Sequence, residues 1–347
     1  MRTIILAVLI ALQCPILLAE DLRIGTTFSP VQSKYLDMDW KETYLSILDS
    51  GFDLIRLGAY WKEIEKEEDV YDFSDLDWQV REARKKGIPV ILTVGMKAPR
   101  WPEYFIPEWV AEKISLRFGA DVSENGYLRE RTLKFIRKVV NHYNEEPIIR
   151  CWQVENEPLN RMGEKYWIIG KDFLEEEVRL ARKLDAAKRP VLLTAATYPN
   201  KFLRFARRFT VKDDPIVGCL ELCDIMGLNV YPVVGQKFWA LEFYVRTGRK
   251  EREAYFSRLL KMVKDKNKEA WIVEFQAEPW EPGELVYKEK EPPPTGRPDL
   301  FRQNIEEFKK LGFDTILLWG AEYWLYREKR HGITTWSDVV NDLLRTK

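Results

Sequence analysis

Two glutamates in this chain stand where a short apolar run gives way to polar residues. Residues 152–158 read WQVENEP and residues 271–280 read WIVEFQAEPW, so Glu157 and Glu274 each follow a run suited to a buried strand. Two carboxyl groups about 5–5.5 Å apart can cleave a glycosidic bond, one as nucleophile and one as general acid and base. Polar residues also end strands for structural reasons alone. The chemistry therefore depends on whether the fold brings the two side chains together.

The rest of the chain alternates short apolar runs with amphipathic stretches. Near-continuous apolar runs are typical of parallel strands that are buried on both faces. Eight of them predict strands, within residues 22–28, 52–61, 89–96, 148–158, 190–198, 224–232, 271–280 and 315–324. Helical periodicity predicts helices within residues 40–51, 75–87, 129–143, 173–187 and 252–265. This alternation predicts an α/β protein with one (β/α)8 TIM-barrel domain over residues 20–347, with an open doubly wound sheet as the alternative.

In such a barrel the reacting groups lie at the C-terminal ends of the strands. The polar and aromatic residues predicted at those ends are Arg56, Tyr60, Trp61, Asn156, Glu157, Asn229, Tyr231, Glu274, Trp319 and Glu322. Glu157 ends the fourth strand, and Glu274 lies on the seventh. We therefore expect the two carboxyl groups to face each other across the mouth of the barrel.

The motifs WQVENEP and WIVEFQAEPW together resemble clan A of the glycoside hydrolases, in which an Asn-Glu pair ends strand four and a second Glu ends strand seven. The phrases YDFSDLD and GIPVIL, within residues 55–92, are similar to the β-galactosidases of family 42 and the cellulases and mannanases of family 5. Two positions depart from family 5. TVGMKAP lacks a histidine at the end of strand three, and Asn229-Val230-Tyr231 stands where His-x-Tyr is common. The resemblance covers nearly all of residues 20–347 and points to the clan rather than to one family.

The resemblance to clan A implies roles for the two glutamates. Glu157 would be the general acid and base, which protonates the leaving oxygen and later deprotonates water. Glu274 would be the nucleophile, which must be ionised, and Arg56 would supply a positive charge beside it. Glu155 and Glu278 are the alternative candidates for these two catalytic roles. In the clan pattern the acid stands directly before proline, which favours Glu157.

The resemblance also implies a set of substrate-binding residues. These are Arg56, Asn156, Tyr231, Trp319, Trp61 and Trp280. Asn156 would hydrogen-bond the sugar 2-hydroxyl, and Trp319 would form an aromatic floor under the sugar. Structural roles are the alternatives: a buried ion pair for Arg56, a core position for Tyr231, a loop cap for Asn156, and packing for the tryptophans.

Composition narrows the classes of function. Lys and Arg total 55, as do Asp and Glu, so the balanced charge predicts no nucleic-acid partner. With His142 and His331 as the two histidines, neither a metal centre nor another cofactor is predicted, which disfavours a metal-dependent sugar isomerase. The expected partner is an oligo- or polysaccharide substrate, and no obligate protein partner is evident. Cys219 and Cys223 are spaced for either a local disulfide or two free thiols.

Residues 1–19 are typical of a secretory signal peptide. Arg2 precedes a long apolar run that ends in small and polar residues near Ala19. Cleavage after Ala19 predicts a protein secreted to the periplasm or to the extracellular space. Leu17 is an unusual residue for the third position before a cleavage site, so an uncleaved membrane anchor is the alternative.

These observations predict a secreted retaining glycoside hydrolase that acts in polysaccharide degradation. It would cleave a β-linked glycan or glycoside by double displacement, in the manner of a cellulase or a β-galactosidase. A barrel that has lost catalysis and only binds carbohydrate is the alternative from another class. The presence of both glutamates together with Arg56 and Tyr231 counts against it. The sequence leaves open the sugar, the linkage, and whether cleavage is internal or terminal.

Overall fold

The computed structural model describes residues 22–346, apart from residues 162, 164, 202–203, 206–213, 284–286 and 291. The predicted signal peptide, residues 1–19, lies outside the described residues. Within the described part of the chain, each helix is too short or too polar to cross a membrane.

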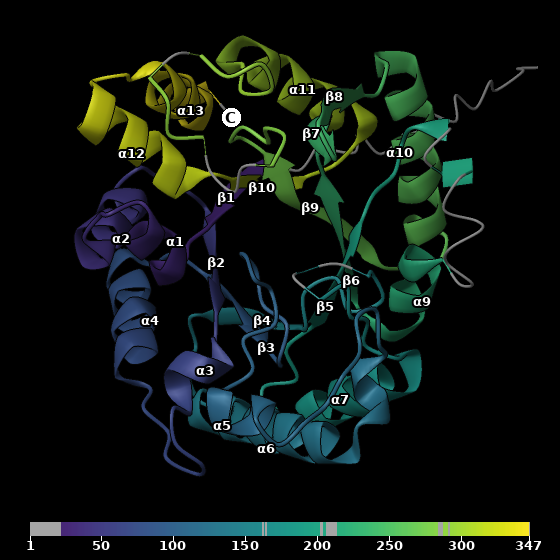
Figure 1. Ribbon diagram of the computed structural model, residues 1–347. Helices are drawn as coiled ribbons and strands as arrows, with labels where there is room; N and C mark the ends of the chain where they lie inside the picture. Colours follow the sequence, from purple (N-terminus) through teal and green to yellow (C-terminus); the bar gives the residue numbers. More distant parts are fainter. Residues whose placement is uncertain are drawn as a thin grey trace, which may run out of the picture.

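Eight parallel strands close into a barrel at the centre of the molecule (Figure 1). They are β1 (Arg23–Thr27), β2 (Leu54–Gly58), β3 (Val90–Val94), β4 (Ile149–Val154), β5 (Val191–Ala196), β6 (Ile225–Val230), β9 (Glu269–Gln276) and β10 (Thr315–Trp319). Neighbours in the barrel follow chain order, and β10 closes the ring against β1. The closed barrel confirms the predicted TIM-barrel fold and excludes the open sheet.

Helices surround the barrel and cover the outer faces of the strands (Figure 1). They are α1 (Pro30–Tyr35), α2 (Trp40–Leu48), α3 (Trp61–Ile64), α4 (Ser74–Lys86), α5 (Glu108–Ala111), η1 (Val122–Glu124), α6 (Gly126–His142), α7 (Lys171–Leu184), α9 (Pro215–Leu222), α10 (Arg249–Lys264), α11 (Pro298–Leu311), α12 (Ala321–His331) and α13 (Thr335–Thr346). The five helices predicted from periodicity are present as α2, α4, α6, α7 and α10. Gly87 at φ 67° ends α4 in the left-handed conformation that favours glycine.

The inside of the barrel is filled by a layer of apolar side chains. Its members are Leu54, Ile91, Cys151, Leu192, Ile225, Trp271, Val273 and Leu317. Side chains on one face of a strand recur every two residues, so Arg56 faces the same side as Leu54, and Gln153 the same side as Cys151. Both polar residues are fully buried. The two-residue period of the strands thus places the polar side chains of Arg56 and Gln153 at the mouth of the barrel, directly above the apolar layer.

β9 is irregular at the position of Glu274. Its pairing with β6 shifts in register between Leu228 and Asn229, and its pairing with β10 also shifts. Val273 belongs to the interior layer, and in a regular strand the next side chain would point to the opposite face. A β-bulge at this point explains why the side chain of Glu274 also reaches the interior, where it meets Arg56.

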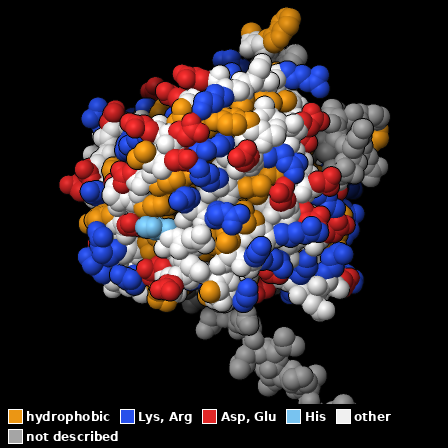
Figure 2. Space-filling view, turned by 90° about the horizontal axis from the view of Figure 1, so that it is seen from below, with side chains coloured by type: hydrophobic (Ala, Val, Ile, Leu, Met, Phe, Trp, Pro, Cys, Tyr) orange, Lys and Arg blue, Asp and Glu red, His pale blue; other side chains and the backbone are white. Residues whose placement is uncertain are grey.

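Three further features bear on the predictions. The sequence alternation did not predict β7 (Val233–Phe238) and β8 (Leu241–Arg246), which form an antiparallel hairpin between β6 and α10. Cys219 and Cys223 are buried free thiols, which decides between the two alternatives for this pair. Figure 2 shows Lys and Arg side chains interspersed with Asp and Glu over one face of the molecule, as the balanced composition leads us to expect.

Candidate active site

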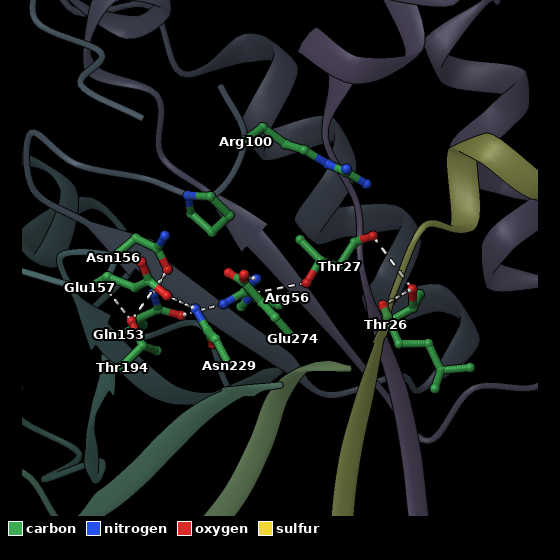
Figure 3. A network of polar contacts seen from close by, with 12 residues as sticks. Thr26, Thr27, Arg56, Arg100, Gln153, Asn156, Glu157, Thr194, Asn229 and Glu274 are labelled. Carbon is green, nitrogen blue, oxygen red and sulfur yellow. Dashed lines mark hydrogen bonds and ion pairs between the residues drawn. The ribbon is translucent and has the colours of Figure 1, made fainter. Parts of the chain in front are cut away.

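Glu157 and Glu274 lie at the C-terminal edge of the barrel. Glu157 follows β4, and Glu274 stands in the last part of β9. Asn229 in β6 connects them, because it is the register partner of Glu274 and its Nδ2 donates to Oε1 of Glu157 at 2.6 Å. Figure 3 shows these three side chains gathered with Arg56 in one polar network. The structure therefore brings the two carboxyl groups into one site.

Two donors hold the Glu274 carboxylate. Nη2 of Arg56 donates to its Oε1 at 2.8 Å, and the Tyr231 hydroxyl donates to its Oε2 at 2.6 Å. Arg56 is fully buried and donates further to Oγ1 of Thr27 at 2.9 Å and to Oε1 of Gln153 at 3.4 Å. A buried guanidinium is strongly destabilising without its carboxylate, so the pair is a structural unit as well. The two donors together fix the orientation of the Glu274 carboxylate.

Glu157 lies in a contrasting environment. Burial, together with the negative charges of Glu274 and Glu103, raises its pKa to about 8. Its N–H donates to Oγ1 of Thr194 at 2.7 Å, and its carbonyl oxygen accepts from Nζ of Lys97 at 2.9 Å. These bonds hold the backbone at φ 46°, a left-handed conformation that is strained for glutamate. One carboxyl group is thus paired with a cation, whereas the other favours its neutral form at pH 7.

Asn156 presents an amide beside Glu157. Its Oδ1 accepts from Nε2 of Gln153 at 3.2 Å and from Oγ1 of Thr194 at 3.3 Å. These two bonds orient the amide, and no acceptor among the described residues takes the Nδ2 donor, which points away from the network in Figure 3. A donor oriented in this way suits a sugar hydroxyl.

Two of the three predicted tryptophans border the site. Trp319 ends β10, and the guanidinium of Arg100 lies over its ring, 3.9 Å from the centroid. The Arg56 guanidinium lies 5.6 Å from the same centroid. Trp280 contacts Tyr231 edge to face, with ring centroids 4.9 Å apart. Part of the Trp319 ring is therefore already covered by a cation, whereas Trp280 borders the tyrosine that binds the predicted nucleophile.

The third tryptophan, Trp61, does not line the mouth. It is the first residue of α3, is fully buried, and stacks on Phe135 of α6 with ring centroids 5.4 Å apart. Its Nε1 donates to Glu65 at 2.6 Å. No part of the ring is accessible to a sugar, so the prediction of Trp61 as a substrate-binding residue is wrong. The helical turn that begins at Trp61 directs this side chain toward the outer helices.

Sequence reasoning missed other polar residues of the site. It places Asn229 at a strand end without revealing its bond to Glu157. Arg100, in the loop after β3, donates to Glu278 at 2.7 Å and to Glu322 at 2.7 Å, which joins the loops after β3 and β9 to the start of α12. Glu278 is thereby engaged in a structural ion pair. The charged residues in MKAPRWPE, directly after the third strand, were the available signal.

The raised pKa of Glu157 predicts a pH-dependent gain in stability for Glu157→Gln. In the folded protein the carboxyl group keeps its proton to about pH 8, whereas the unfolded chain loses it near the ordinary value of 4.5. Between these values unfolding releases a proton, so the free energy of unfolding falls by about 1.4 kcal/mol per pH unit. Glutamine does not titrate, so the variant does not lose stability in this way. Its free energy of unfolding should exceed that of the wild type by a margin that grows from about pH 5 to about pH 8. Urea unfolding measures the margin, and one that did not vary with pH would contradict the raised pKa.

Residues 28–174 match the family model of glycoside hydrolase family 42, described as β-galactosidase. The match includes Arg56, Asn156 and Glu157 and ends before Glu274. The β-galactosidase BbgII of Bifidobacterium bifidum is 29% identical over 126 residues, which are 34% of this chain and 18% of that protein. The family match thus covers β2, β3 and β4, and the match to BbgII spans less than a fifth of that relative.

Solved structures are similar over nearly the whole chain. A cold-adapted β-galactosidase from Rahnella sp. R3 has a TM-score of 0.64 at 14% identity, over 94% of this chain and 56% of that one. GH5_18 from Streptomyces cattleya, solved in complex with GlcNAc, has a TM-score of 0.62 at 12% identity, over 95% of this chain and 82% of that one. At these identities the likeness concerns the fold, and the chain spans about half the length of the Rahnella enzyme. Taken with the family 42 match, it confirms that this chain resembles the clan A glycoside hydrolases.

Proposed function

We propose that the chain is a retaining β-glycosidase in which Glu157 is the general acid and base and Glu274 is the nucleophile. The observation that carries the proposal is that two neighbouring carboxyl groups lie in opposite electrostatic environments. Glu274 accepts bonds from Arg56 and Tyr231, whereas buried Glu157 favours its neutral form. Double displacement requires this division between a charged nucleophile and a protonated acid.

In the first half of the proposed reaction, Glu274 attacks the anomeric carbon while Glu157 protonates the departing oxygen. Asn229 donates to Oε1 of Glu157, which leaves Oε2 to carry and deliver the proton. Nδ2 of Asn156 would donate to the sugar 2-hydroxyl, a bond that strengthens in the transition state. The products of this half are the free leaving group and a glycosyl ester on Glu274.

In the second half, Glu157 takes a proton from the water that attacks the glycosyl ester. Formation of the ester removes the negative charge of Glu274, which is one of the groups that raise the pKa of Glu157. The pKa of Glu157 therefore falls in the intermediate, as a general base requires. Release of the sugar restores the charge on Glu274 and the proton on Glu157.

The proposed substrates are β-linked glycosides of oligo- or polysaccharides. β-Galactosides come first, because the matching family model and the Bifidobacterium relative both carry the name β-galactosidase. Secretion by way of residues 1–19 is part of the same proposal and rests on the apolar run after Arg2.

A substrate screen tests the proposal. Purified residues 20–347 are assayed on aryl β-galactoside, β-glucoside and β-mannoside, on the matching α-galactoside, and on β-linked polysaccharides with products separated by size. We expect turnover of at least one β-glycoside, none of the α-galactoside, and no loss on adding a chelator. Binding of β-glycosides without hydrolysis would indicate the non-catalytic carbohydrate-binding barrel instead.

A further inference from the structure

Glu155 ties the end of β4 to the loop after β3. Its carboxyl group is fully buried, with Oε1 accepting the N–H of Met96 at 2.8 Å and Oε2 accepting the N–H of Lys97 at 2.6 Å. The contact is close, because a Cβ on Gly95 would lie 2.1 Å from Oε1, and the φ of 117° also favours glycine there. The ionised carboxylate is the form that accepts both N–H groups.

Glu177 on α7 adjoins this carboxyl group without a donor of its own. Its side chain is fully buried, and neither carboxyl oxygen accepts a hydrogen bond from an N–H group of the described residues. An ionised Glu177 would be a buried charge without donors beside a second negative charge, which is strongly unfavourable. Protonation of Glu177 removes its charge, and the O–H that it creates can donate to Glu155. Burial raises the pKa of Glu155 to about 7, and burial together with the Glu155 charge raises that of Glu177 well above its ordinary value.

The cations near the pair are engaged by other groups. Nζ of Lys97 lies 3.1 Å from Oε2 of Glu103 and donates to the carbonyl oxygen of Glu157. Nη2 of Arg129 donates to Glu176 at 2.6 Å. Neither cation is left to balance a second negative charge on the pair. The titratable and charged groups around the pair are Lys97, Glu103, Tyr104, Asp121, Arg129 and Glu176.

We propose that Glu155 and Glu177 hold one shared proton at neutral to mildly alkaline pH, carried by Glu177, and that this pair positions Glu157. Glu155 precedes Glu157 by two residues, and both have left-handed backbones, at φ 59° and 46°. Lys97 bonds to both, through its N–H to the Glu155 carboxylate and through Nζ to the Glu157 carbonyl. Loss of the proton would set two buried charges against each other and loosen the backbone that directs Glu157. The positioning role rests on the proposed function, whereas the shared proton does not.

Counting protons tests the shared proton independently of activity. Glu177 in the folded protein keeps a proton that it loses on unfolding, so Glu177→Gln should release one proton fewer than the wild type above about pH 7, where Glu155 is ionised. The slope of the free energy of unfolding against pH is proportional to the number of protons released, and urea titration at a series of pH values measures this slope. Glu175→Gln, a partly exposed neighbour on α7, should match the wild type. Equal slopes for the wild type and Glu177→Gln would overturn the shared proton.

Kinetics test the positioning role. Glutamine can still donate an N–H to Glu155, so Glu177→Gln should keep kcat within about twofold of the wild type. Glu177→Leu removes the donor and should lower kcat by about tenfold or more at an unchanged KM, because a misdirected acid harms the chemical step. The loss should shrink on aryl glycosides with good leaving groups, which depend less on Glu157.

The outcomes separate the two proposals. Equal kcat for the folded Leu and Gln variants would overturn the positioning role, as would a loss of kcat that did not depend on the leaving group. If Glu177→Leu fails to fold, a large loss of kcat in Glu177→Gln would overturn it instead. A wild type without glycosidase activity would refute the proposed function, and the proton count would still decide whether Glu155 and Glu177 share a proton.

Discussion

Glu274→Ala is expected to lose at least about 10⁴-fold in kcat, because the variant lacks the group that attacks the anomeric carbon. Azide can enter the vacated space and attack the same carbon from the same face. Activity on an activated aryl β-glycoside should therefore return in part with added azide, and the product should be the α-glycosyl azide, since only one inversion occurs. The measurements are kcat with and without azide and the product configuration by NMR.

The variant needs a check on folding, because its alanine leaves Arg56 without the carboxylate that balances it. Removing one partner of a buried ion pair lowers stability by about 3–5 kcal/mol, so Glu274→Gln, which keeps an acceptor, serves as the second inactive variant. Glu269→Gln, at the opposite end of β9, should behave like the wild type. Near-normal turnover by either folded Glu274 variant would remove Glu274 from the nucleophile role.

Glu157→Ala is expected to show a loss that depends on the leaving group. For oligosaccharides and alkyl glycosides, whose leaving oxygen must be protonated, kcat should fall by about 10²–10⁴-fold. For a dinitrophenyl glycoside the glycosylation step needs no acid, so it should proceed at nearly the wild-type rate. Azide should then capture the intermediate on Glu274 and give the β-glycosyl azide, opposite to the product of the Glu274 variant. The same loss on all leaving groups would assign Glu157 a structural role.

Much of the fold could be predicted because barrel strands are buried on both faces. Such strands read as continuous apolar runs, and all eight runs became strands of the barrel. The β7–β8 hairpin escaped prediction for a local reason. Its turn at Trp239 and Ala240 holds a tryptophan at φ 56°, where glycine or asparagine is the usual signal. A turn without glycine or asparagine gives no recognisable signal in the sequence, so this hairpin was not predicted.

The rule that reacting groups lie at strand ends predicted much of the candidate site. It gave Arg56, Asn156, Glu157, Tyr231 and Glu274, and the structure gathers these residues at the mouth of the barrel. The bulge that turns Glu274 inward has no sequence signal, because it depends on the register between strands. Long-range pairs such as Arg100 with Glu278 depend on loops that meet only in the fold. Trp61 was mispredicted because a helix begins at that residue and directs its side chain toward the outer helices instead of the mouth.

The configuration of the first-formed sugar tests double displacement by Glu157 and Glu274 most directly. The measurement follows the anomeric proton by NMR immediately after the protein meets a β-glycoside substrate, before the free sugar mutarotates. One inversion through Glu274 and a second through water give net retention, so the β-anomer is expected to appear first. An α-anomer at the earliest times would show a single displacement and contradict the assignment of Glu274 as the nucleophile.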